Sequence, residues 1–160
     1  VGADGAGDAS VLFPPALNEV VIEKQALGRT VRLAVSIDGE FFTSYVADGL
    51  IIASPTGSTA YSLSARGPVV APTLRALLLT PVSPHSLFDR SLVLEPTSTV
   101  AVAVMGDRPA GLAVDGEHLC LLEPGTTVSV TADRRPARVV SFRASDFHKI
   151  LKAKFGLNDR

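Results

Sequence analysis

The sequence predicts a mostly β domain of the α+β class, with its strands in a sandwich-like arrangement. Short apolar runs rich in Val and Ile recur along the chain between turn-forming residues. Asp-Gly pairs at 38–39 and 115–116 lie between such runs, as in two-residue β-hairpin turns. Only two segments carry the apolar spacing or the flanking signals of helices.

The first 15 residues are expected to form a flexible or hairpin leading segment, because Gly, Ala, Asp and Ser dominate its start. Strands then follow in close succession. The run at 50–53 is continuously apolar, as expected of a strand that is covered on both faces. The other strands are predicted at 20–22, 31–37, 41–47, 99–104, 112–114, 118–122, 127–131 and 139–142.

Two helices are predicted among the strands. The first spans 59–66, follows a loop rich in Ser and Thr, and ends at the Gly-Pro pair at 67–68. The second begins with Ser145 as its N-cap and has Asp146 in its first turn. We expect a structural role for this second helix because its apolar side chains share one face: Phe147, Ile150 and Leu151.

The length and composition indicate one domain that covers residues 1–160. A chain of this length buries about two-thirds of the surface that it exposes when unfolded, which is enough for one core. The 15 Lys and Arg residues against 16 Asp and Glu leave a net charge of −1, which argues against nucleic acid as a partner. No apolar run approaches the roughly 18 residues of a membrane helix, so no membrane association is expected.

Cysteine and histidine usage narrows the possible chemistry. Cys120 is the single cysteine, so no disulfide forms within the chain and a reducing, cytoplasmic location is expected. His85, His118 and His148 share no metal-ligand spacing, and no metal site is predicted. The chain begins with Val1 rather than Met, and we therefore expect it to be part of a longer protein.

The most informative stretch, residues 48–64, combines an apolar strand, a loop of small hydroxyl residues and a helix start. The free N–H groups of a helix start favour an anionic or carbonyl-bearing ligand. Gly57 allows a ligand to approach the backbone, and the ring of Tyr61 suits stacking against a base. The carboxylate of Asp48 accepts hydrogen bonds from an amide or a sugar hydroxyl. On spacing alone, a capped turn without a ligand explains the same residues.

Asn18 and Glu19 form a second candidate site at the head of an apolar strand. An amide both donates and accepts hydrogen bonds, and a carboxylate accepts them from paired hydroxyls. The two side chains together therefore suit the edge of a ribose. A strand-end pair that faces water is the alternative interpretation.

At these residues the chain resembles the NAD kinase family, over nearly its whole length from about residue 16 onward. The string Pro-Thr-Gly-Ser-Thr-Ala-Tyr at 55–61 is the most specific part of the match. It follows Leu-Asn-Glu-Val-Val at 17–21 and Asp-Gly-Leu-Ile-Ile at 48–52, and it precedes Thr-Pro-Val-Ser-Pro-His at 80–85 and Val-Asp-Gly at 114–116. The resemblance implies the C-terminal, NAD-binding domain of such an enzyme, mostly β with one short helix at the ligand site and a C-terminal helix.

The resemblance also implies a reaction and a set of ligand contacts. NAD kinases transfer a phosphoryl group from ATP, or from polyphosphate in some members, to the 2′-hydroxyl of the adenosine ribose of NAD and so produce NADP. By position, Asn18 and Glu19 lie at the adenosine, and Asp48, Ala60 and Ser64 hold the nicotinamide end. Further contacts to the dinucleotide are implied for Arg29, Thr59, Tyr61, Ser62, Leu63, His85 and Glu117.

Other implied features lie outside this chain. The catalytic Asp of the family belongs to a Gly-Gly-Asp-Gly segment in an N-terminal α/β domain. Only 17 residues precede Asn18, so no catalytic residue is expected here and the chain alone is expected to be inactive. A divalent metal, Mg²⁺, is expected to accompany ATP in the full enzyme, with none bound by this chain alone. The family usually works as a homo-oligomer, and a homo-oligomer is expected.

Two residues depart from the family pattern. Arg66 stands where such sequences often have Gly, and Val46 stands where some members have a basic residue. Two alternatives to a dinucleotide kinase remain on the sequence alone. One is a lipid kinase of the same superfamily, of the diacylglycerol or sphingosine type. The other is a non-catalytic β module that binds nucleotides or other partners.

Overall fold

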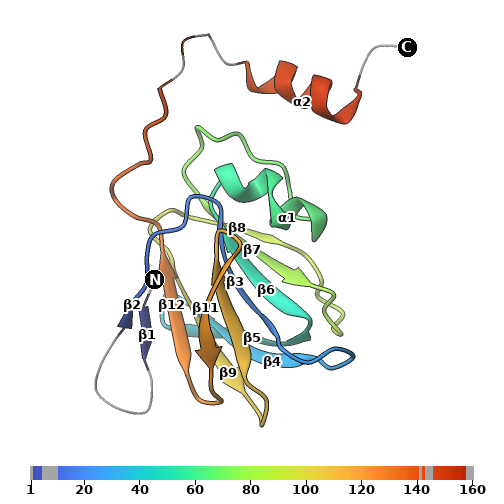
Figure 1. Cartoon of the computed structure of the whole chain (residues 1–160), viewed down its shortest axis with the longest axis vertical. Helices are drawn as coiled ribbons and strands as arrows, with labels where there is room; N and C mark the ends of the chain where they lie inside the picture. Colours follow the sequence, from blue (N-terminus) through green and yellow to red (C-terminus); the bar gives the residue numbers. More distant parts are fainter. Residues whose placement is uncertain (1, 5–10, 141, 143–145, 158–160) are drawn as a thin grey trace.

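Two six-stranded antiparallel sheets pack face to face in the computed structural model, which describes residues 2–4, 11–140, 142 and 146–157 (Figure 1). The first sheet has the order β2-β1-β12-β9-β4-β5 and contains β1 (Gly2–Asp4), β2 (Val11–Leu12), β4 (Val31–Ile37), β5 (Glu40–Ala47), β9 (Thr99–Met105) and β12 (Thr127–Thr131). The second sheet has the order β11-β10-β3-β6-β7-β8 and contains β3 (Glu19–Lys24), β6 (Gly49–Ala53), β7 (Leu77–Val82), β8 (Leu92–Leu94), β10 (Ala110–Val114) and β11 (Glu117–Leu122). The predicted mostly β, sandwich-like fold is confirmed.

The main core lies between the two sheets. Strands of the first sheet alternate buried and less buried residues, as β9 does along its length, because one of their faces remains open to solvent. In contrast, all five residues of β6 are buried. The outer face of β6 is covered by a second apolar cluster, which contains Ile51, Ala53 and Val70. The continuous apolar run at 50–53 is therefore a strand covered on both faces, as its sequence predicts.

Both predicted Asp-Gly turns are hairpin turns. Asp38 and Gly39 have φ angles of 52° and 86°, and Asp115 and Gly116 have 49° and 85°. Positive φ at both central residues is the requirement of a type I′ turn, whose twist matches that of the flanking strands. The first turn joins β4 to β5, and the second joins β10 to β11.

The strand predictions were incomplete at β7 and β8 and wrong near the C-terminus. Pro81 lies within β7 and pairs with Leu50 of β6. On its other side β8 pairs only with Leu77–Leu79, so Pro81 lies where β7 has one neighbouring strand. A strand tolerates proline in such edge-like positions. The strand predicted at 139–142 is absent from its described residues, where Val139 and Val140 are 85% and 82% exposed. A run of β-branched residues forms a strand when neighbouring strands and side chains pack against it, and these exposed valines lack such packing among the described residues.

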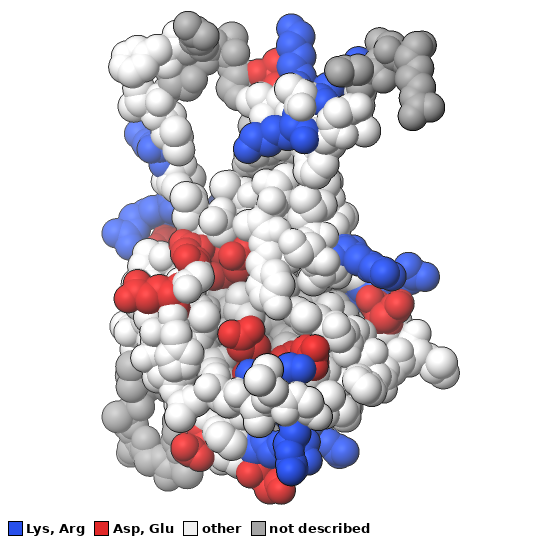
Figure 2. All heavy atoms as spheres, turned by 45° about the vertical axis from the view of Figure 1, so that its right-hand side comes forward, with Lys and Arg blue, Asp and Glu red and all other residues white. Residues whose placement is uncertain are grey.

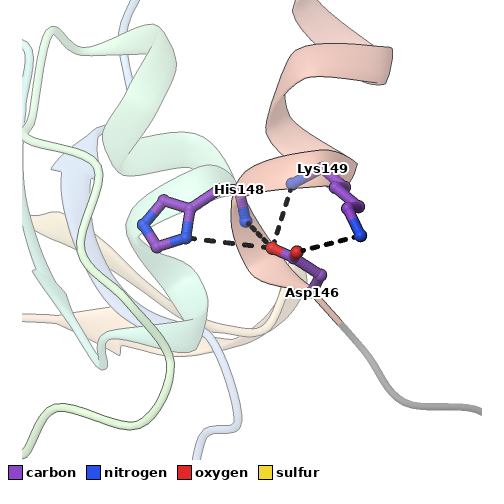
Figure 3. A network of polar contacts seen from close by, with 3 residues as sticks. All are labelled: Asp146, His148 and Lys149. Atoms are coloured by element: carbon purple, nitrogen blue, oxygen red, sulfur yellow. Dashed lines mark hydrogen bonds and ion pairs between the residues drawn. The ribbon is translucent and has the colours of Figure 1, made fainter.

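Helix α2 (Phe147–Phe155) is the last element of the chain and comes after β12 in the sequence (Figure 1). Its N-cap is Asp146, not the predicted Ser145, which lies outside the described residues. The Asp146 carboxylate accepts hydrogen bonds from the backbone N–H groups of His148 and Lys149 at 3.1 and 3.3 Å, and the Lys149 ammonium lies 3.5 Å away (Figure 3). These donors, with the Lys149 N–H as the largest cause, lower the pKa of Asp146. The helix ends at Gly156 in the left-handed conformation.

The charged residues are distributed without a dominant sign. On the face shown in Figure 2, acidic side chains gather at mid-height, and basic side chains lie beside and between them. No helix among the described residues has the length and hydrophobicity needed to cross a membrane.

Candidate functional site

The loop after β6 is anchored to the residues that precede β3. The backbone N–H of Ser54 donates to the carbonyl oxygen of Asn18 at 2.8 Å, and the Ser54 hydroxyl donates to the carbonyl of Leu17 at 2.6 Å. The same hydroxyl accepts a hydrogen bond from the N–H of Gly57 at 3.2 Å. One serine therefore joins the two segments that the sequence marked as separate candidate sites.

Gly57 makes this junction possible by lacking a side chain. It lies in the 3₁₀ turn η1 (Thr56–Thr59), directly against the backbone of Asn18. A Cβ at Gly57 would lie only 2.8 Å from the Asn18 Cα and still closer to its carbonyl group. Gly57 therefore serves the packing of two backbones against each other, in addition to any approach of a ligand.

Two of the small hydroxyl residues support the site from beneath. Ser58 is fully buried, and its hydroxyl donates to the carbonyl of Val70 and accepts from the Val70 N–H, at 3.1 and 3.0 Å. Ser62, in helix α1 (Tyr61–Ser64), is also fully buried, and its hydroxyl pairs with that of Thr80 at 3.0 Å. The Ser62 side chain, which the resemblance places at the dinucleotide, is thus committed to holding α1 on β7.

The exit of α1 is a Schellman motif with an arginine in the left-handed position. The N–H of Gly67 donates to the carbonyl of Ser62 at 2.7 Å, and the N–H of Arg66 donates to that of Leu63 at 3.0 Å. Arg66 has φ of 66°, where glycine is the favoured residue. Gly67 fits tightly, because a Cβ there would lie 2.8 Å from the Ser62 carbonyl oxygen. The unexpected arginine therefore preserves the helix exit at a cost in backbone strain.

Glu19 is the most unusual titratable group of the site. The residue is 7% exposed, and its Oε2 atom is buried without a hydrogen-bond partner among the described residues. Burial raises the pKa of Glu19, the backbone N–H of Tyr61 opposes this change, and the charge of Asp115 adds to the rise. The Glu19 carboxylate thus lies near the start of α1, which belongs to the first candidate segment.

Asp48 lies near the other end of β3, where it pairs with a residue that the sequence analysis did not identify. The Lys24 ammonium lies 2.6 Å from Asp48 Oδ1, and the two side chains are 28% and 34% exposed. The strand register sets this contact, because β3 and β6 are adjacent and Lys24 donates its N–H to the Asp48 carbonyl at 2.8 Å. Alternation along β3 could not reveal Lys24, because the pairing depends on a strand that is remote in sequence.

Tyr61 connects the two ends of the site. Its side chain is partly exposed, at 39%, and its backbone N–H lowers the pKa of Glu19 against the effect of burial. Burial raises the pKa of the Tyr61 hydroxyl, the charges of Glu23 and Asp48 raise it further, and the charge of Lys24 lowers it. The charges that shift the pKa of the Tyr61 hydroxyl thus belong to residues at the Asp48 end of β3.

The other predicted site residues are all exposed or partly exposed. Arg29 is exposed in the loop after β3, and Glu117 is exposed at the start of β11. His85 is exposed beyond β7, and its backbone N–H donates to the carbonyl of Val46 at 2.7 Å. On or next to α1, and partly or fully exposed, lie Thr59, Ala60, Leu63 and Ser64.

Polar side chains lie at both ends of β3: Asn18 and Glu19 at its start, and Lys24 with Asp48 at its end. Glu19 and Lys24 are separated by five strand steps, or roughly 17 Å at about 3.4 Å per residue. A cavity of about 970 Å³ opens beside Asn18 and is also lined by Ser54, Thr56, Arg75 and Arg134. The residues that line this cavity do not include Tyr61, Lys24 or Asp48, and fold and site together define a candidate ligand-binding β-sandwich domain.

The described residues do not form a metal centre. No three His, Cys, Asp or Glu side chains converge within the described part of the chain.

Comparisons with known proteins name the family. The model of the ATP-NAD kinase C-terminal domain matches residues 17–142. The chain is 42% identical to NAD kinase 1 of Streptomyces avermitilis over 159 residues, covering 98% of this chain and 44% of that protein. It is 43% identical to the NAD kinase of Moorella thermoacetica over 140 residues, covering 87% of this chain and 45% of that protein. The chain belongs to the ATP-NAD kinase C-terminal domain family, and it spans less than half the length of these two relatives.

Solved structures agree with this assignment. Yeast NADH kinase, in complex with NADH, matches with a TM-score of 0.77 and 35% identity, over 81% of this chain and 38% of that chain. An NAD kinase from Archaeoglobus fulgidus, in complex with ATP, matches with a TM-score of 0.67 and 28% identity, over 76% of this chain and 47% of that chain. The resemblance inferred from the sequence is confirmed.

Proposed function

We propose that this chain is the dinucleotide-binding part of an enzyme that phosphorylates the 2′-hydroxyl of the adenosine ribose of NAD and so produces NADP. The observation that carries the proposal is the packing of Gly57 directly against the backbone of Asn18. It joins the two motifs, 39 positions apart at Asn18 and Gly57, into one site. The relatives named above, a kinase bound to NADH and one bound to ATP, support the same activity for the whole protein.

The two ends of the site suit the two halves of NAD. At one end, the Asn18 amide and the Glu19 carboxylate are the groups assigned to the ribose hydroxyls, because both side chains accept hydrogen bonds. At the other end, Asp48 offers a carboxylate to the nicotinamide amide, and the resemblance assigns Ala60 and Ser64 to the same half of the ligand. Between them, the partly exposed ring of Tyr61 provides a flat surface for the dinucleotide.

The proposed contribution of this chain to catalysis is positioning. Phosphoryl transfer depends mostly on alignment of the reactants and on stabilisation of charge. By holding the acceptor ribose at a rigid strand end, Asn18 and Glu19 would fix the direction from which a phosphoryl donor must approach. The donor, ATP or polyphosphate, and Mg²⁺, which would neutralise phosphate charge, are assigned to groups outside the described site, with the catalytic Asp in an N-terminal domain.

Two further features belong to the proposal. The single Cys120, which is partly buried and free, supports a reducing cytoplasmic location. A homo-oligomer is proposed from the family resemblance.

The test uses the protein expressed from its complete coding sequence. The purified protein is incubated with NAD, ATP and Mg²⁺, and NADP is measured with an NADP-specific dehydrogenase. NADH in place of NAD, and polyphosphate in place of ATP, define the acceptor and the donor. Formation of NADP in the complete reaction, and not without a donor, is expected. Absence of NADP, together with no binding of NAD in titration calorimetry, would contradict the proposal.

A further inference from the structure

The carboxylate of Asp115 holds three consecutive backbone N–H groups at the start of β3. Its oxygens accept hydrogen bonds from Leu17 at 2.6 Å, from Asn18 at 2.7 Å and from Glu19 at 3.0 Å. The N–H of Asp115 in turn donates to the carbonyl of Glu19 at 3.0 Å. These donors outweigh the effect of burial and lower the pKa of Asp115. The charged carboxylate is therefore the form that binds this segment.

A second Asp-Gly turn in the same molecule shows which part of this arrangement is general. Asp38 also has a left-handed backbone, accepts a hydrogen bond from Thr99 at the start of β9 at 2.7 Å, and donates its N–H to the Thr99 carbonyl at 2.9 Å. Each turn therefore docks the first residue of a neighbouring strand. Asp115 holds two additional N–H groups, those of Leu17 and Asn18, which precede β3.

The additional bonds fix the peptide units that carry the proposed nucleotide contacts. The carbonyls of Leu17 and Asn18 bind the hydroxyl and the N–H of Ser54, so the segment is held by Asp115 through its N–H groups and by Ser54 through its carbonyls. Two such clamps leave the segment little freedom to rotate. The directions of the Asn18 and Glu19 side chains follow from the backbone held in this way.

We propose that Asp115 is a positioning residue for dinucleotide binding, which aligns Asn18 and Glu19 without contacting the ligand itself. The inference rests on the proposed function. It predicts a selective effect: loss of the Asp115 carboxylate weakens binding of the dinucleotide acceptor and leaves the phosphoryl donor unaffected.

Two substitutions separate this role from the structure of the turn. Asp115→Asn keeps the size of the side chain and tolerates positive φ, but it replaces one acceptor oxygen by a donor NH₂ group. Asp115→Gly favours the left-handed backbone and removes the carboxylate completely. The matched control is Asp38→Asn, which makes the same chemical change in the corresponding turn of the other sheet. All three variants are made in the full-length protein.

Steady-state kinetics and amide hydrogen exchange provide the readouts. For both Asp115 variants we expect the KM for NAD to rise about tenfold, with the KM for ATP within about twofold of wild type, and faster exchange at residues 17–19. For Asp38→Asn we expect unchanged KM values. If Asp115→Asn fails to fold, the glycine variant provides the measurement.

A KM for NAD within about twofold of wild type in a folded Asp115 variant would overturn the inference, as would an equal rise in Asp38→Asn. The exchange measurement is independent of activity. If wild type forms no NADP and does not bind NAD, the proposed function fails. Unchanged exchange at residues 17–19 in the variants would instead show that Asp115 does not anchor this segment.

Discussion

Replacement of Glu19 by Gln should stabilise the free protein and weaken its binding of NAD. Oε2 of Glu19 is buried without a partner among the described residues, and burial raises the pKa of the group. An unsatisfied buried polar group costs about 1–3 kcal/mol, and more when it is charged. Gln removes the charge but still buries an amide, so we expect a gain of about 1 kcal/mol in the free energy of unfolding at pH 7.

The gain should depend on pH in one direction. A carboxyl group whose pKa is higher in the folded state than in the unfolded state favours folding fully only below its unfolded pKa. This contribution is lost as the pH rises through the folded pKa. The difference between Glu19→Gln and wild type should therefore be small below the ordinary Glu pKa of 4.5 and should grow toward neutral pH.

Guanidinium chloride unfolding at a series of pH values measures this difference, and titration calorimetry with NAD at pH 7 measures the effect on binding. Removal of one acceptor should reduce NAD affinity about tenfold. Glu40→Gln, at an exposed position on β5, is the control and should change stability by less than about 0.5 kcal/mol at each pH. A Glu19→Gln variant that is less stable than wild type at pH 7 would refute the reasoning, because the carboxylate would then have a partner in the free protein.

Three further substitutions test other parts of the structure. Asp48→Asn should weaken NAD binding by about 1–3 kcal/mol in calorimetry, because the ligand loses a charged acceptor, and equal affinities would remove Asp48 from the site. Arg66→Gly should raise the melting temperature by about 2–4 °C, since relief of left-handed strain of about 1–2 kcal/mol exceeds the entropy cost of glycine, whereas Arg66→Ala, which keeps the Cβ, should show no such rise. Tyr45→Phe should stabilise the fold by about 1 kcal/mol in denaturant unfolding, because the Tyr45 hydroxyl is buried in the core without a partner among the described residues, and a loss of stability would point to a bound water.

Sequence patterns predicted most of the strands and turns correctly. They failed where the structure of a segment depends on which strand lies beside it. The alternation in β4 and β9 and the Asp-Gly turns are local signals, and both were read correctly. Strand β7 was not predicted. It contains Pro81, which a strand tolerates there only because β8 pairs no further than Leu79. Val139 and Val140 have the composition of a strand, but no strand lies beside them among the described residues. Neither fact is contained in the local sequence.

For the site, the sequence identified the segments more readily than the function of each side chain. The two motifs meet through Ser54 and Gly57, as the resemblance requires. The hydroxyl of Ser62 looked suited to a ligand but is used to hold α1 on β7. The partners Lys24 and Asp115 were not recognised as part of the site, because their contacts depend on the register of strands that are far apart in the sequence.

The meeting of residues 17–19, 54–57 and 115 has a consequence for how this protein becomes competent to bind. These segments are brought together only when β10, β3 and β6 are aligned side by side in the second sheet. A partly folded chain therefore lacks the assembled site. Under the proposed function, a nucleotide that binds only the completed sheet would shift the folding equilibrium toward the native state, and the stability of the domain would rise with the nucleotide concentration.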